Sequence, residues 1–168
     1  MRTETPAPAA VPAPAPGTAT VTWGLLAAWM LNDAEELATM ARFSGMPQRR
    51  VGVAIGLMGC VVAAASAAGS RTGGRSRFFR TAVTGFGLHG VTHLVSAAVL
   101  GRYTPGVATA PTVVIPYALW AARRMRAAGV PLTDGEVRGT VLRGLGLAAA
   151  TTATVQGVAW LATRDGRR

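Results

Sequence analysis

Three acidic residues and two histidines are the side chains in this sequence most able to do chemistry. Asp33, Glu35 and Glu36 are three of the seven acidic residues, and they lie in a hydrophobic run long enough to cross a membrane. Both histidines, His89 and His93, lie in another apolar run. A carboxylate inside a bilayer costs about 2.5–3.5 kcal/mol on insertion scales, so such groups usually face a bundle interior, a partner or water. The sequence therefore predicts a polar site buried among membrane helices.

Helical geometry groups the polar side chains of the first run on one face. Each helical residue advances about 100° around the axis, so Asn32, Glu35 and Glu36 fall within about 100° of one another. Trp29 points the same way, and Asp33 lies at the edge of this arc. We expect Asn32 to orient a water molecule or a substrate oxygen, and Trp29 and Asp33 to contact substrate beside it.

The two histidines are four residues apart, so their side chains lie about 40° apart on a helix. If His89 and His93 meet Glu35 and Glu36, two carboxylates and two imidazoles converge in an apolar pocket. Such mixed ligands suit zinc, iron or manganese. The same groups could also act without metal, as acid, base and proton relay. Tyr117 could add a phenol to this site, although tyrosine is also an interfacial anchor.

Five apolar runs separated by arginine-rich breaks predict an all-α integral membrane bundle of about five transmembrane helices. The predicted spans are Val21–Phe43, Val51–Gly69, Thr81–Leu100, Val107–Ala122 and Gly139–Ala162. Pro111 and Pro116 predict a kinked or tilted fourth helix, since neighbouring helices can satisfy the carbonyls that a proline frees. Residues 1–19 predict a disordered Pro/Ala-rich tail, residues 20–163 the transmembrane domain, and residues 164–168 a basic tail.

The positive charge of the chain comes from arginine alone. All 17 basic residues are arginines, and the formal net charge is +10. They lie almost entirely between or beside the apolar runs, as the basic flanks of membrane helices do. This placement favours contact with membrane lipid and argues against nucleic acid as a partner. We expect a multi-pass protein of the cell membrane with its N-terminus inside. Cys60, alone in an apolar stretch, predicts a small buried hydrophobe.

Three segments, in this order and spacing, carry a family resemblance. They are MLNDAEELAT (Met30–Thr39), GLHGVTHLV (Gly87–Val95), and RYTPGVATA followed by PYALW (Arg102–Ala110, Pro116–Trp120). With them the chain resembles the HXXEE family of small, mostly uncharacterised bacterial membrane proteins. The resemblance implies that Glu35, Glu36, His89 and His93 form the functional cluster. Asn32 stands where the motif has its first histidine, and asparagine is a poorer transition-metal ligand than imidazole.

These observations predict a membrane-embedded enzyme acting on a lipophilic, isoprenoid-like small molecule. Glu35 and Glu36 would be acid/base groups or carboxylate ligands, and His89 and His93 would be ligands or proton relays. Isomerisation, cyclisation of the terpene-cyclase kind and hydrolysis all suit a buried acid.

Three other functions stay open for the same residues. The first is a metal-dependent oxidoreductase holding iron. The second is a proton-coupled transporter, which the few polar residues outside the cluster count against. The third is a structural or partner-binding membrane protein. The all-arginine, Ala/Gly-rich composition is typical of a high-GC actinobacterial gene, in which a role in specialised metabolism would fit, and small-residue helix faces could support a homodimer.

Overall fold

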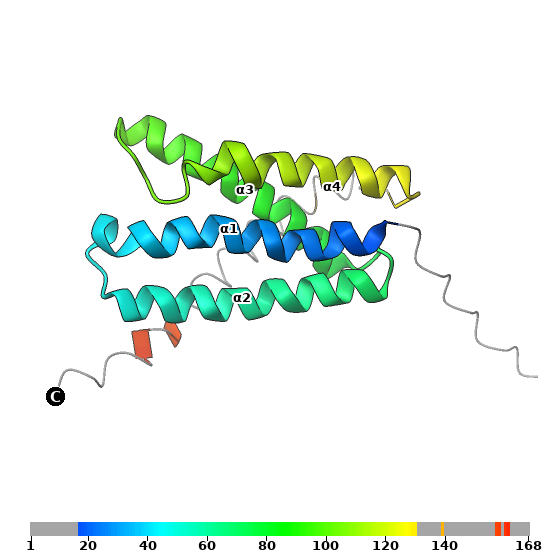
Figure 1. Cartoon of the computed structure of the whole chain (residues 1–168), viewed down its shortest axis with the longest axis horizontal. Coiled ribbons are helices and arrows are strands. Elements are labelled where there is room, and N and C mark those ends of the chain that lie inside the picture. Colours follow the sequence, from blue (N-terminus) through cyan, green and yellow to red (C-terminus); the bar gives the residue numbers. More distant parts are fainter. Residues whose placement is uncertain (1–16, 131–138, 140–156, 159, 162–168) are drawn as a thin grey trace, which may run out of the picture.

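The computed structural model describes residues 17–130, 139, 157–158 and 160–161, and residues 17–130 form a bundle of helices (Figure 1). Its elements are α1 (Thr18–Ser44), α2 (Gln48–Arg71), α3 (Arg77–Leu100), η1 (Ala110–Val114, a π-helix) and α4 (Ile115–Ala127). No strand occurs among the described residues, so the predicted all-α class is confirmed. Residues 1–16 of the predicted N-terminal tail, the predicted basic C-terminal tail and nearly all of the predicted fifth span lie outside the described residues. Thr18 and Ala19, which were assigned to the N-terminal tail, already belong to α1.

Glycine, proline and serine set the ends of the long helices. α1 ends at Gly45, which adopts a left-handed φ of 70° and donates its N–H to the carbonyl of Ala41. Glycine adopts this conformation without a Cβ penalty. Pro47 immediately precedes α2, and the Ser76 side chain accepts the backbone N–H of Phe79 at the start of α3. The short connections that result make successive helices antiparallel neighbours.

The two prolines of the predicted fourth span mark a π-helical turn. The span was expected over Val107–Ala122, but helix begins only at Ala110 and continues to Ala127. The N–H of Ile115 reaches the carbonyl of Ala110, five residues back, which is the π-helical pattern. Pro116 has no N–H to donate, so a regular α-helix would lose a hydrogen bond at this residue. The wider π-helical turn lies immediately before it along the chain.

The core lies where the four α-helices face one another. In Figure 1, α1 runs between α2 and α4, with α3 crossing behind, and α1 packs most extensively on α2. The buried apolar cluster comprises Val21, Leu25, Ala28, Val62, Ala65, Phe79, Val83, Phe86, Val114, Ala121 and Met125. Gly69 allows close approach here, since a Cβ on it would lie 2.5 Å from Cγ of the Phe79 ring and 2.9 Å from the methyl group of Thr22.

α2 and α3 are long and apolar enough to cross a membrane. Each has 24 residues, and only 28% and 22% of their most apolar windows are buried within the protein. Their apolar side chains therefore face outward more than those of a soluble core helix, which is consistent with membrane association. α1 and α4 do not meet the same criteria; α1 carries the acidic cluster, and α4 has 13 residues. Cys60, expected to be buried, is exposed on α2, because its side of the helix has no neighbour among the described residues.

Candidate metal centre

One carboxylate and two imidazoles converge where α1 meets α3. The Oε1 atom of Glu36 lies 3.2 Å from Nε2 of His89 and 3.0 Å from Nε2 of His93. The two histidine Nε2 atoms are 2.8 Å apart. Three potential ligand atoms thus form a triangle with sides near 3 Å, which is geometrically able to bind a metal ion. We call these three residues the triad.

The protons available to the triad do not satisfy all of its close contacts. A neutral imidazole carries one N–H, on either of its two ring nitrogens. Only one proton can lie between the Nε2 atoms of His89 and His93, and a second proton aimed at Glu36 would face the first at close range. A single cation contacting all three atoms satisfies the three lone pairs together. Mixed carboxylate and imidazole donors are ligands that divalent transition metals accept.

The triad is buried on two sides and open on the third. The side chains of Glu36 and His93 are 11% and 10% exposed, whereas that of His89 is 46% exposed. A small molecule can therefore approach past His89 without unfolding the bundle. Catalytic zinc sites have the same character, with three protein ligands and one position left for water or substrate.

Asn32 is fully buried beside the triad and connects it to the loop after α3. Its Nδ2 donates to Oε1 of Glu36 at 2.9 Å, so it orients the carboxylate. Its Oδ1 lies 3.0 Å from the hydroxyl of Thr109, which shares its single proton between this oxygen and the closer Oε2 of Glu35. Asn32 therefore contacts a triad residue through its donor and the neighbouring loop through its acceptor.

Glu35 points away from the triad and holds the loop between α3 and η1. Its Oε1 accepts hydrogen bonds from the Tyr103 hydroxyl and from the N–H of Ala108, the latter at 3.2 Å. Its Oε2 accepts the N–H of Thr109 at 2.8 Å and the Thr109 hydroxyl at 2.6 Å. The hydrogen bond to the Glu35 carboxylate favours the protonated phenol and so raises the pKa of Tyr103 above its usual value.

The loop held by Glu35 packs directly on His93. Gly106 adopts a φ of 81°, and a Cβ on it would lie 2.6 Å from Nε2 and 2.7 Å from Nδ1 of His93. The Thr104 hydroxyl also lies 3.4 Å from the backbone carbonyl of His93, to which it donates. Only glycine fits at position 106, because both its backbone conformation and its distance from the imidazole exclude a side chain.

The other three side chains predicted to contact substrate have different positions: one faces another helix, one lies far from the triad, and one is buried next to Asn32. The Trp29 ring packs on Gly59 of α2. The Tyr117 hydroxyl donates to the carbonyl of Val21 at 2.7 Å, about 22 Å along α1 from Glu36 at about 1.5 Å per residue. Asp33 is buried, 8% exposed, beside Asn32. Substrate contacts by Trp29, Asp33 and Tyr117 stay predictions.

Sequence reasoning missed the loop residues that support the site. None of Tyr103, Gly106 and Thr109 was singled out as a site residue from the sequence. All three lie in RYTPGVATA, one of the segments that carried the family resemblance. The available signal was that this polar, glycine-containing stretch is itself one of the segments of the family resemblance.

The fold and the triad define an all-α helical protein with two membrane-length helices and a carboxylate–imidazole cluster at a helix junction. The chain belongs to the HXXEE family, because residues 23–121 match the family described as "Protein of unknown function with HXXEE motif". This region contains Asn32, Glu35, Glu36, His89 and His93. Comparison with curated proteins and with solved structures found no match.

Proposed function

We propose that the triad of Glu36, His89 and His93 holds a divalent metal ion. The observation that carries this proposal is the convergence of three potential ligand atoms. The imidazole protons available there cannot satisfy all three close contacts between these atoms. Asn32 supports it by fixing the Glu36 carboxylate from behind. Outer contacts of this kind orient ligands in known metal sites. Both carboxylate oxygens of Glu35 accept hydrogen bonds from the loop after α3. We therefore assign Glu35 to holding this loop and not to binding the metal.

We further propose that this site belongs to an enzyme of the cell membrane, spanning it about five times, with a lipophilic and isoprenoid-like substrate. Apolar side chains are exposed along α3, the helix that carries both histidines, among them Val91, Val95 and Val99. An exposed apolar surface on this helix suits a protein that meets lipophilic molecules. A bound divalent ion would supply a Lewis acid or an activated water for isomerisation, cyclisation or hydrolysis. Glu36, His89 and His93 would hold that ion, and His89 is also the exposed residue at the entrance.

Metal analysis of purified protein tests the metal proposal. The protein is purified in detergent without chelators, reconstituted in turn with zinc, iron and manganese, desalted, and analysed for bound metal. We expect one metal ion per chain in the native protein and less than a tenth of that in Glu36→Ala and His93→Ala. Cys60→Ser is the control, because an exposed thiol is a common adventitious ligand, and it should retain the metal. No binding by the native protein, or equal binding by all four proteins, would reject the metal site.

The donor set favours one second candidate, a metal-dependent oxidoreductase holding iron. Two histidines and one carboxylate with open positions are the ligand set of non-haem Fe(II) oxygenases. Anaerobic reconstitution separates the two functions, since an oxidoreductase should select Fe(II) and change its visible absorbance on exposure to O₂. Selection of zinc with no response to O₂ would leave the acid/base enzyme as the function.

A further inference from the structure

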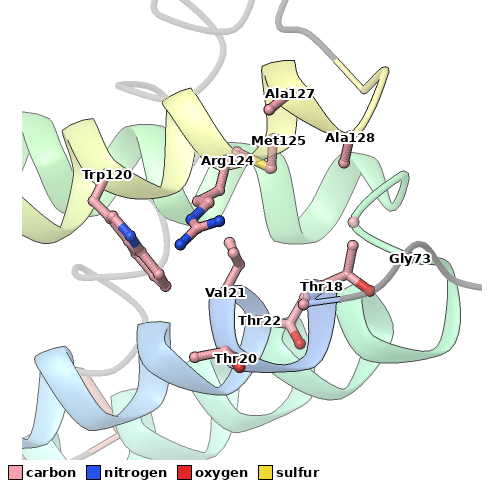
Figure 2. A pocket seen from close by; sticks show the side chains of 12 residues that line it. Thr18, Thr20, Val21, Thr22, Gly73, Trp120, Arg124, Met125, Ala127 and Ala128 are labelled. Carbon is pink, nitrogen blue, oxygen red and sulfur yellow. The ribbon is translucent and has the colours of Figure 1, made fainter.

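A second candidate site lies at the opposite end of the bundle from the triad. A cavity of about 330 Å³ opens between the start of α1, the turn from α2 to α3, and the end of α4 (Figure 2). Thr20, Gly74, Trp120, Arg124 and Ala128 are among the residues that line it. We propose that this cavity binds the phosphate group of an anionic ligand.

Arg124 is the one charged side chain among the described residues that line the cavity. In Figure 2 its side chain extends from α4 toward Val21 on α1, beside the Trp120 ring. The guanidinium carbon lies 6.0 Å from the centre of that ring, a cation–π contact that orients the side chain. Among the described residues no carboxylate pairs with Arg124. Its guanidinium presents a planar set of N–H donors that matches the oxygens of a phosphate.

Among the described residues, the charged side chains around the cavity are all basic. Seven arginines belong to the ends of α2, α3 and α4 that surround it or to the turn between α2 and α3: Arg71, Arg75, Arg77, Arg80, Arg123, Arg124 and Arg126. The acidic residues of the described bundle, Asp33, Glu35 and Glu36, all lie farther along α1, and its first turn contains no acid. This field attracts an anion and disfavours a cation at the cavity.

Phosphate-bearing ligands fit this place better than other anions. A phosphate offers several oxygens to an arginine and to nearby hydroxyls such as that of Thr20, and the cavity has room for a headgroup beyond the phosphate itself. The predicted orientation, with the N-terminus inside, places this end at the cytoplasmic surface, where basic pockets between membrane helices meet anionic lipid headgroups. The phosphate could come from such a lipid or from a soluble anion.

Two variants test the site without relying on loss of fold. Arg124→Gln removes the guanidinium. Thr20→Glu places a carboxylate at the cavity but also in the first turn of α1, where an acid stabilises a helix, so the protein should stay folded. Arg49→Gln, an exposed arginine at the other end of the bundle, is the control for overall charge.

The protein in neutral detergent is titrated with phosphatidylglycerol and with phosphatidylcholine by native mass spectrometry, and with inorganic phosphate by thermal shift. We expect tighter binding of phosphatidylglycerol, weakened about tenfold or more in both cavity variants, as loss of a charge-assisted contact predicts. That result identifies a lipid phosphate. Stabilisation by inorganic phosphate that both variants lose, without lipid preference, identifies a soluble one. No preference and no stabilisation, or equal weakening by Arg49→Gln, overturns the proposal.

Discussion

Replacing Glu35 by glutamine separates the two glutamates of the motif by their roles. Each carboxylate oxygen of Glu35 accepts one backbone N–H and one hydroxyl from the loop after α3. The glutamine amide keeps one oxygen as an acceptor and places its NH₂ group where the other oxygen accepted a backbone N–H and a hydroxyl. A hydroxyl can rotate away from the new donor, whereas the backbone N–H cannot. Glu35→Gln therefore loses at least one charge-assisted hydrogen bond and sets two donors against each other, which should destabilise the docked loop by about 1.5–3 kcal/mol.

The effect should reach the triad through the loop. Gly106 packs on the imidazole of His93, so a loop that leaves its position also releases that ligand. Loss of an outer contact typically weakens metal binding about 10–100-fold, and we expect Glu35→Gln to fall in that range. The assay is competitive metal titration against a chromophoric chelator, with circular dichroism melting in parallel. Tyr103→Phe should show a smaller effect in the same direction, because it removes one hydroxyl donor from Glu35.

Two outcomes would refute this reasoning in different ways. Native affinity in Glu35→Gln, with only a lower melting temperature, would show that the loop does not support His93. Complete loss of binding, equal to that of Glu36→Ala, would show that Glu35 is itself a ligand. Thr112→Val is the matched control, because this exposed threonine bonds only to the carbonyl of Ala108 among the described residues and does not contact Glu35. It should bind metal as the native protein does.

Two further predictions concern the neighbours of the triad. Gly106→Ala should weaken metal binding at least tenfold, because its methyl group would collide with His93. Gly101→Ala has a φ of 61° but open space around it, so it should lower only the stability of the protein, by about 1–2 kcal/mol. Metal titration and thermal melting of both variants distinguish these effects. Asn32→His should tighten metal binding by adding an imidazole beside Glu36, and titration showing equal or weaker affinity would mean that the histidine cannot reach the ion.

The helices and the triad were predictable because both follow from simple periodicities. Apolar runs placed α1, α2 and α3 within four residues of their observed ends, and the i, i+4 spacing placed His89 and His93 on one face. That α1 and α3 meet at these residues followed from polarity, since a buried carboxylate needs a partner. The supporting loop was not predictable in this way, because Thr109 reaches Glu35 across a separation of 74 residues and no periodicity encodes that contact.

The spacing of the motif explains why the adjacent residues Glu35 and Glu36 contact different parts of the protein. On a helix, residues i and i+4 point the same way, whereas i+3 and i+4 diverge by about 100°. Asn32 and Glu36 therefore meet, and Glu36 faces the histidines, while Glu35 faces the loop. The first motif position lies between these two directions and contacts both Glu36 and Thr109. A neutral imidazole offers one donor and one acceptor, and the asparagine amide offers the same pair. Asn32 can thus replace the hydrogen bonds of the motif histidine between triad and loop but not its ring nitrogen as a ligand, so the proposed metal ion would be held by Glu36 and the two histidines of α3.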